Sequence, residues 1–218
     1  MLSLSLPRGE RPLRRVLAIG CHADDLEIGC GGTLLALTRE QEDLEVTWVV
    51  LGAGGDRAAE ARASAEGFLA NAGRAEVVVH GFRDAYMPYH GESVKEAFEE
   101  LKRVEPDLVL THTRDDLHQD HRLACELTWN TFRDHLILEY EVPKWDGDLG
   151  RPNLYVPLGD DVVEHKLDLL LRHFPSQAGK HWFDLETFRG LMRLRGLECA
   201  APSRYAEAFY APKVVVSS

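Results

Sequence analysis

The sequence predicts a single α/β domain built around a mostly parallel β-sheet. Short apolar runs of strand length alternate with segments of helical periodicity, which is typical of parallel strands joined by crossover helices. The 218 residues, 44% of them hydrophobic, are enough for one core without disulfides or oligomerisation. We therefore expect one domain at residues 16–218, preceded by an N-terminal tail at residues 1–15.

The first half of the chain supplies three of the expected strands. A continuous apolar run at 16–20 is typical of a strand that is buried on both faces. The run at 46–51 predicts the second strand, and the valines at 77–79 predict the third. An alanine-rich segment over roughly 57–72 has the composition of the helix that joins them.

Three glycines separate the first strand from the first expected helix. They are Gly29, Gly31 and Gly32. Glycine at this density is expected to form a turn, after which Thr33 caps a helix that extends to about Arg39. The dinucleotide-binding turn of an oxidoreductase is a competing interpretation, but the third glycine of that motif would fall at Leu34.

The second half of the chain predicts one more central strand and several later elements. A helix is expected over 93–104 because apolar residues share one face, and Pro106 ends it. The run 107–111 predicts a strand, and a helix is expected over about 119–133. Further strands are expected at 137–142, 154–158 and 205–210, and further helices from about 160 and over roughly 185–194.

Two polar clusters follow predicted strands. The first contains His22, Asp24 and Asp25, and the second contains His118, Asp120 and His121. Because the carboxyl ends of parallel strands meet at one edge of a sheet, we expect the two clusters to lie close together. Imidazole and carboxylate groups bind zinc while leaving one coordination position open for water. The sequence therefore predicts a divalent-metal hydrolase site.

The spacing assigns a chemical role to the members of the first cluster. His22 and Asp25 stand three positions apart on a loop and can converge on one ion, with His121 as the third ligand. A zinc-bound water has its pKa lowered from about 16 to about 7, which makes it a nucleophile at neutral pH. Asp24, next to a ligand, is the expected general base.

The second cluster supplies a proton donor. His118 lies one helical turn before His121 and can protonate a leaving amine or stabilise an oxyanion, with Asp120 fixing its tautomer. A lone histidine is more often a structural residue, and we interpret His112 in that way. An isolated Asp-Asp pair is usually a helix cap, so the metal interpretation depends on the combination of both clusters.

The composition argues against several classes of partner. A formal charge of -11 and a pI near 5.4 oppose binding to nucleic acids and to anionic membrane surfaces. No apolar stretch approaches the ~20 residues of a membrane helix, and the N-terminus lacks the order of a signal peptide. We expect a cytoplasmic protein that acts on a small molecule, and a homo-oligomer is compatible with the sequence.

These clusters closely resemble the two motifs of the PIG-L/LmbE-like N-acetylglucosaminyl deacetylase family. The first motif, H-[PA]-D-D-x-E-x-G-x-G-G-T, matches His22 to Thr33, and the second, H-x-D-H, matches His118 to His121. The resemblance implies a three-layer, Rossmann-like fold and metal-dependent hydrolysis of an N-acyl group, usually the acetyl of an amino sugar. It also implies the same roles as the spacing: ligands at His22, Asp25 and His121, the base at Asp24, and the acid or oxyanion pair at His118 and Asp120.

The resemblance adds two candidate substrate-binding residues. Arg62 is similar to the family's substrate-contacting arginine, and Asp84 is similar to its sugar-hydroxyl-binding acid. Ala23 replaces the more frequent proline of the first motif but is not a ligand position.

The expected function is that of a zinc-dependent amidase, which removes an acetyl or formyl group from an amino sugar or an amino-sugar conjugate. Fe²⁺ and Co²⁺ also suit this set of ligands. A non-catalytic carbohydrate- or metal-binding module is the first alternative, although it would need a spoiled site. A dinucleotide-dependent oxidoreductase is the second, and the broken glycine pattern opposes it.

Overall fold

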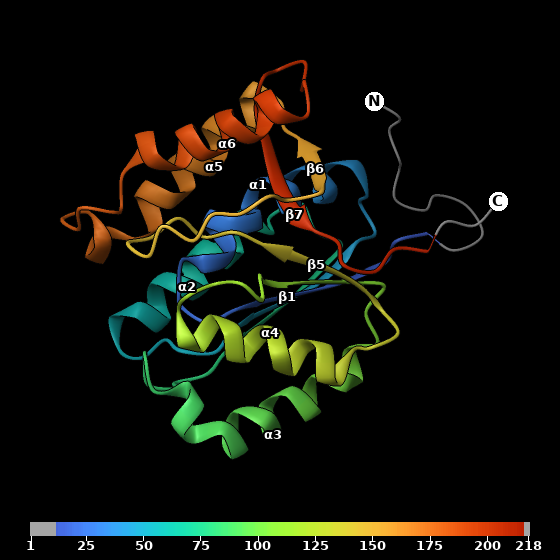
Figure 1. Cartoon of the computed structure of the whole chain (residues 1–218), viewed down its shortest axis with the longest axis vertical. Helices are drawn as coiled ribbons and strands as arrows, with labels where there is room; N and C mark the ends of the chain where they lie inside the picture. The colour runs from blue at the N-terminus through green and yellow to red at the C-terminus, as the bar shows by residue number, and fades with distance from the viewer. Residues whose placement is uncertain (1–11, 216–218) are drawn as a thin grey trace.

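A seven-stranded, mostly parallel sheet runs through the middle of the protein, which a computed structural model describes over residues 12–215 (Figure 1). The strand order is β3-β2-β1-β4-β5-β7-β6. Five strands are parallel: β1 (Arg15–Gly20), β2 (Glu45–Val50), β3 (Arg74–Val79), β4 (Leu108–His112) and β5 (Leu136–Tyr140). β7 (Ala206–Tyr210) runs antiparallel to β5 and to β6 (Leu154–Pro157). The predicted mostly parallel α/β sheet is confirmed.

Helices cover both faces of this sheet and complete a three-layer fold. One face packs against α1 (Asp25–Glu40), α2 (Asp56–Phe68), α5 (Asp160–His173) and α6 (Leu185–Glu198). The other packs against α3 (Gly91–Leu101) and α4 (Gln119–Thr131), which lie together below the sheet in Figure 1. The described residues also form three short 3₁₀ helices: η1 (Met87–His90), η2 (Lys102–Val104) and η3 (Pro175–Gln177).

The order of the strands in the sheet has a switch point between β1 and β4. β1 pairs with β2 on one side and with β4 on the other, in a register that joins Val16 to Leu108 and Ala18 to Leu110. The strands that follow β1 therefore move outward in one direction, and those that follow β4 move outward in the other. In open α/β sheets such a switch point leaves a crevice at the carboxyl ends of the strands. The loops after β1 and β4 both open there.

The glycine segment lies inside a helix and does not form the predicted turn. α1 begins at Asp25, so Gly29, Gly31 and Thr33 are all helical. A Cβ added at Gly29 would lie 2.2 Å from the Tyr140 ring, and one at Gly31 would lie 2.5 Å from the Phe68 ring. The glycines therefore permit close contact between α1 and its neighbours, which outweighs their low helix propensity.

A buried ion pair fixes the middle of α1. The ammonium of Lys166 on α5 lies 2.7 Å from Glu207 on β7, and both side chains are buried. Glu207 accepts hydrogen bonds from the backbone amides of Gly32 and Thr33, each at 2.7 Å, while Lys166 donates to the Ile28 carbonyl at 2.7 Å. Each charge thus has a partner and additional hydrogen bonds, as a buried ion pair requires.

Several boundaries differ from the predicted ones. β1 begins at Arg15 and Leu13 is already buried in the core, so the predicted tail at 1–15 overlaps the folded domain; its residues 1–11 lie outside the described residues. α2 ends at Phe68, before the predicted end at 72, and α6 continues to Glu198. Among residues 12–215, no helix combines the length and apolar character that crossing a membrane requires.

Replacing Gly29 by Ala should test the close approach of α1. The added methyl group would collide with the buried Tyr140 ring, so we expect a loss of about 1–3 kcal/mol in the free energy of unfolding, measured by urea denaturation. Gly190→Ala in α6 is the matched control because its Cβ would enter open space, and it should be neutral or gain up to about 1 kcal/mol. Equal effects of both substitutions would contradict this account of the glycines.

Candidate active site

The two predicted clusters meet at the carboxyl ends of β1 and β4. His22 lies in the short loop after β1, and Asp25 is the first residue of α1. On the other side of the switch point, His118 is the N-cap of α4 and His121 lies in its first turn. The pairing of β1 with β4 therefore brings together residues that are almost one hundred positions apart.

The three predicted metal ligands point their donor atoms at one another. His22 Nδ1 lies 3.1 Å from His121 Nε2, and Asp25 Oδ2 lies 3.3 Å from the first nitrogen and 3.4 Å from the second. Ligands at about 2.1 Å from a tetrahedral cation stand about 3.4 Å apart, so this triangle fits a zinc-sized ion. Asp25 and His121 are buried, and only one edge of His22 reaches solvent.

The other ring nitrogen of each imidazole contacts carboxylates. His121 Nδ1 lies 2.9 Å from Asp116 Oδ2, and the Lys144 ammonium lies 2.9 Å from the same oxygen. His22 Nε2 lies 2.9 Å from Asp84 Oδ1 and 3.4 Å from Asp120 Oδ2. Such outer contacts orient metal-binding histidines and fix their tautomers. Asp116 and Lys144 were not predicted, although Asp116 lies only two positions before the second motif.

His112 also contacts the cluster, from the end of β4. Its Nε2 accepts a hydrogen bond from the Cys21 amide at 3.0 Å and lies 3.2 Å from Asp25 Oδ2 and 3.1 Å from the Tyr140 hydroxyl. Complete burial, together with the charge of His121, lowers the pKa of His112 to about 4. The imidazole is therefore neutral at physiological pH, and its acceptor nitrogen lies beside the Asp25 carboxylate without donating to it.

Charges within the cluster set the protonation of the predicted ligands. Burial alone would raise the pKa of Asp25, but the nearby imidazoles of His121 and His22 hold it well below its usual value. Burial likewise opposes protonation of His22, yet the nearby carboxylates of Asp25 and Asp120 raise its pKa. The carboxylate thus stays ionised, which a metal ligand must be.

Asp24 has one paired and one free oxygen. Its side chain is almost fully buried, and Oδ1 lies 2.9 Å from Nη2 of Arg57. Oδ2 is buried and has no hydrogen-bond partner among residues 12–215. Burial raises the pKa of Asp24, while Arg57 partly opposes this shift. A raised pKa and a free oxygen are what a general base needs.

The arginine at the site is Arg57, and the predicted Arg62 is not brought to the cluster. Arg62 lies on the exposed side of α2 and donates to the Val77 carbonyl at 3.3 Å. Arg57 lies in the first turn of α2 and is held by Glu60 at 3.2 Å as well as by Asp24. Arg57 comes directly after the loop that follows β2, at the carboxyl ends of the strands. This position could have identified it from the sequence as a site residue.

The carboxylate of Asp120 has a different set of contacts from the predicted one. It accepts hydrogen bonds from the Ala85 amide at 2.7 Å and the Met87 amide at 3.2 Å, and thereby anchors the loop that carries Asp84. The tautomer of His118 is instead fixed by the main chain, because its Nδ1 accepts the Asp120 amide at 3.2 Å. The proton of neutral His118 therefore lies on Nε2, and burial together with His121 lowers the pKa of this imidazole.

The second predicted substrate-binding residue lies at the mouth of the site. Asp84 is 73% exposed, and its Oδ1 lies 3.9 Å from His118 Nε2 in addition to its contact with His22. The structure therefore brings seven of the eight predicted site residues together and leaves out Arg62.

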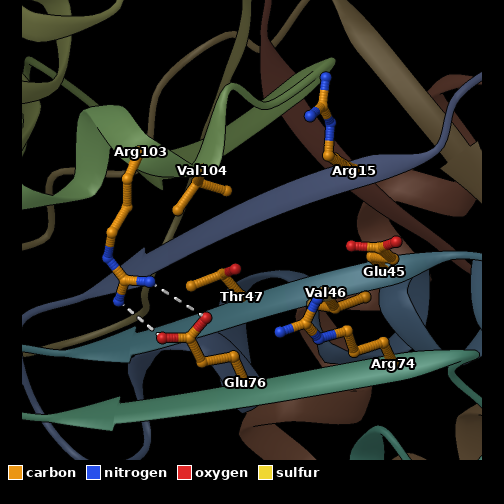
Figure 2. A pocket seen from close by; sticks show the side chains of 8 residues that line it. All are labelled: Arg15, Glu45, Val46, Thr47, Arg74, Glu76, Arg103 and Val104. Carbon is orange, nitrogen blue, oxygen red and sulfur yellow. Dashed lines mark hydrogen bonds and ion pairs between the residues drawn. The ribbon is translucent and has the colours of Figure 1, made fainter.

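A separate cavity of about 240 Å³ lies at the opposite edge of the sheet, where β1, β2 and β3 begin (Figure 2). Arginines and glutamates alternate along its wall, and Arg103 is paired with Glu76 at 2.6 Å. Because the two signs of charge are interleaved, the cavity does not present a single field to a ligand.

The chain belongs to the family of GlcNAc-PI de-N-acetylases, known as PIG-L. The family model matches residues 17–132, which is more than half of the chain and includes both motifs. Among functionally curated proteins, no sequence matches the chain.

Several solved structures share the fold. A conserved protein from Thermus thermophilus has a TM-score of 0.74 and 20% identity, over 94% of this chain and 97% of its own. The N,N'-diacetylchitobiose deacetylase from Pyrococcus horikoshii has a TM-score of 0.70 and 23% identity, over 90% and 83%. The 4-carboxy-2-hydroxymuconate hydratase from Pseudomonas putida has a TM-score of 0.74 and 18% identity, over 94% and 99%. The fold therefore serves more than one reaction.

Replacing Asp116 by Asn should weaken metal binding without removing a ligand. The substitution takes away the carboxylate that orients His121, so we expect an affinity for Zn²⁺ or Co²⁺ about 10- to 100-fold lower, measured by competition with a chelator. Asp115→Asn is the matched control because the neighbouring carboxylate is exposed and makes no contact with His121 in the structure. An unchanged affinity in the Asp116 variant would remove this residue from the metal site.

Proposed function

We propose that the protein is a metal-dependent N-deacetylase, which hydrolyses the N-acetyl or N-formyl group of an amino sugar or amino-sugar conjugate. Membership of the PIG-L family supports the reaction class. The observation that carries the proposal is the triangle of His22, Asp25 and His121, beside a buried carboxylate with a free oxygen. Zn²⁺ is the proposed ion, and Fe²⁺ and Co²⁺ suit the same ligands.

The proposed chemistry divides between the ion and the protein. A divalent cation at the three ligand atoms would polarise the amide carbonyl and lower the pKa of a water molecule. Asp24 takes the proton of that water through its free Oδ2 as the new C–O bond forms. Neutral His118 donates a hydrogen bond from Nε2 to the carbonyl oxygen as that oxygen becomes an oxyanion, and Asp24 passes the proton that it took to the amide nitrogen. The C–N bond breaks, and the nitrogen leaves as an amine once it has received a proton.

Asp84, at the mouth of the site, and Arg57, beside the base, have separate proposed roles. Asp84 is exposed and already an acceptor, so it suits a hydrogen bond from a sugar hydroxyl. Arg57 holds Oδ1 of Asp24 and so directs the free oxygen of the base. Neither task depends on Arg62.

The alternatives are weaker on specific grounds. A hydratase shares the fold, but likeness at this level of identity concerns the fold alone. A dinucleotide-dependent enzyme needs the glycine turn at the helix start, whereas these glycines lie within α1, packed closely against neighbouring side chains. A non-catalytic module would have no use for a buried, partly unpaired Asp24 beside three converging ligands.

Replacing Asp24 by Ala tests the base. Metal content, measured by elemental analysis, should stay the same, while release of amine from an N-acetylated sugar should fall by about 10²- to 10⁴-fold. The comparison variant is His22→Ala, in which metal content should fall as well. Unchanged turnover in the Asp24 variant would remove it from the mechanism, and full metal retention in the His22 variant would contradict its role as a ligand.

A pair of arginine variants on α2 tests which arginine serves the site. Arg57→Gln leaves Asp24 without its partner, and a misdirected base should lower kcat by about 10- to 100-fold. Arg62→Gln should change kcat by less than about twofold because that side chain lies on the exposed side of the helix. Steady-state kinetics of both variants would decide, and the reverse order would restore Arg62 as the functional residue.

A further inference from the structure

An exposed tryptophan stands on the loop between β5 and β6. Trp145 is 74% exposed, although tryptophan is among the residues that a folded protein usually covers. Its ring stacks on that of His181, which belongs to the loop between η3 and α6, with ring centroids 5.3 Å apart and planes inclined by 23°. Two loops that are distant in sequence thus meet through a pair of exposed rings.

Ion pairs and a hydrogen bond connect the loop of Trp145 to one side of the active site. The ammonium of Lys144, its neighbour, lies 2.9 Å from Asp116 and also contacts Asp148 at 2.5 Å. Asp148 in turn accepts the Leu117 amide at 2.7 Å. Because Asp116 orients the ligand His121, Trp145 stands one residue away from the outer contacts of the metal site.

Hydrogen bonds of the preceding helix η3 connect the loop of His181 to the other side of the active site. The loop follows η3, in which Ser176 donates from its amide to Glu60 at 2.9 Å, and Arg57 lies 3.4 Å from the Ser176 hydroxyl. Arg57 is the partner of Asp24, so this loop is joined to the base. In Figure 1 both loops extend on the side of the sheet toward which the β5 arrow points, where the active site lies.

The stacked pair has the chemistry of a platform for a sugar ring. A pyranose has an apolar face of C–H groups, and a flat aromatic ring covers that face while the hydroxyls stay in water. Burial of such a face against an indole is favourable through both apolar area and dispersion. The His181 ring supports one face of Trp145, and the high exposure leaves other parts of the indole open to a ligand.

We propose that Trp145, supported by His181, forms a subsite for a sugar ring linked to the one that carries the N-acyl group. The inference rests on the proposed deacetylase function and assigns it a specificity-determining residue: Trp145 favours a substrate whose N-acylated sugar is linked to a second ring over a free hexosamine. Trp145 then contributes binding energy remote from the amide, whereas the cluster of His22, Asp25 and His121 acts on the amide itself.

The experiment compares two substrates of the metal-loaded protein, N-acetylglucosamine and N,N'-diacetylchitobiose. In Trp145→Ala, kcat/KM for the disaccharide should fall by about tenfold, mainly through KM, because one stacked ring is lost. The value for the monosaccharide should stay within about twofold. Trp145→Phe should keep most of the disaccharide preference, since it retains an aromatic face.

Leu197→Ala is the control because Leu197 is 76% exposed, like Trp145, but lies on α6. It should leave both substrates unaffected. An equal loss for both sugars in Trp145→Ala, or no loss for either, would overturn the subsite.

A binding measurement separates the subsite from the reaction. Calorimetric titration of both sugars into the metal-loaded Asp24→Ala protein should show tighter binding of the disaccharide, and the added Trp145→Ala substitution should remove that difference. If the wild-type protein hydrolyses neither sugar, the deacetylase function on these sugars fails, while the titration still decides the subsite. Disaccharide binding that does not depend on Trp145, or an absence of binding, refutes it.

Discussion

The parallel pairing of β1 with β4 is the interaction on which the rest of the site depends. β4 is fully buried and β1 is buried from Val16 onward, and their register places the ends of the two strands side by side at the switch point. No local interaction could join His22 to His121, because they belong to distant parts of the chain. The apolar residues that bury the central strands therefore also determine the distance between the ligand atoms.

The site gathers negative charge in a place where water is scarce. Four of its carboxylates, those of Asp24, Asp25, Asp116 and Asp120, are almost completely buried. Each of them has a compensating partner. Asp24 pairs with an arginine and Asp25 with imidazoles, whereas Asp116 contacts a lysine and an imidazole, and Asp120 accepts hydrogen bonds from backbone amides. Buried carboxylates that are close together raise one another's pKa unless positive charge or hydrogen bonds hold them ionised. A site of this composition is suited to a cation.

The sequence was sufficient for the sheet and for most of the site, since buried strands and the polar residues behind them leave clear patterns. It was misleading at α1, because glycine usually breaks helices. The close contacts of Gly29 with Tyr140, of Gly31 with Phe68 and of Gly32 with Leu158 and Glu207 explain the three glycines inside this helix. Arg62 was inferred by resemblance, whereas the arginine that contacts Asp24 is Arg57, on the helix after the neighbouring strand β2. Asp116 lies close to His121 in the sequence, whereas its partner Lys144 comes from the loop after β5, and no local spacing encodes that contact.

The ion pair of Lys166 and Glu207 makes the amino-terminal motif depend on the far end of the chain. The region matched by the family model ends at residue 132. The helix that begins with Asp25 nevertheless forms hydrogen bonds with Lys166 on α5 and Glu207 on β7, which come later in the chain. A fragment limited to the matched region would leave the Gly32 and Thr33 amides without this acceptor and expose the apolar flank of α1. The matched region thus depends for the packing of its first helix on two side chains that lie beyond it in the chain.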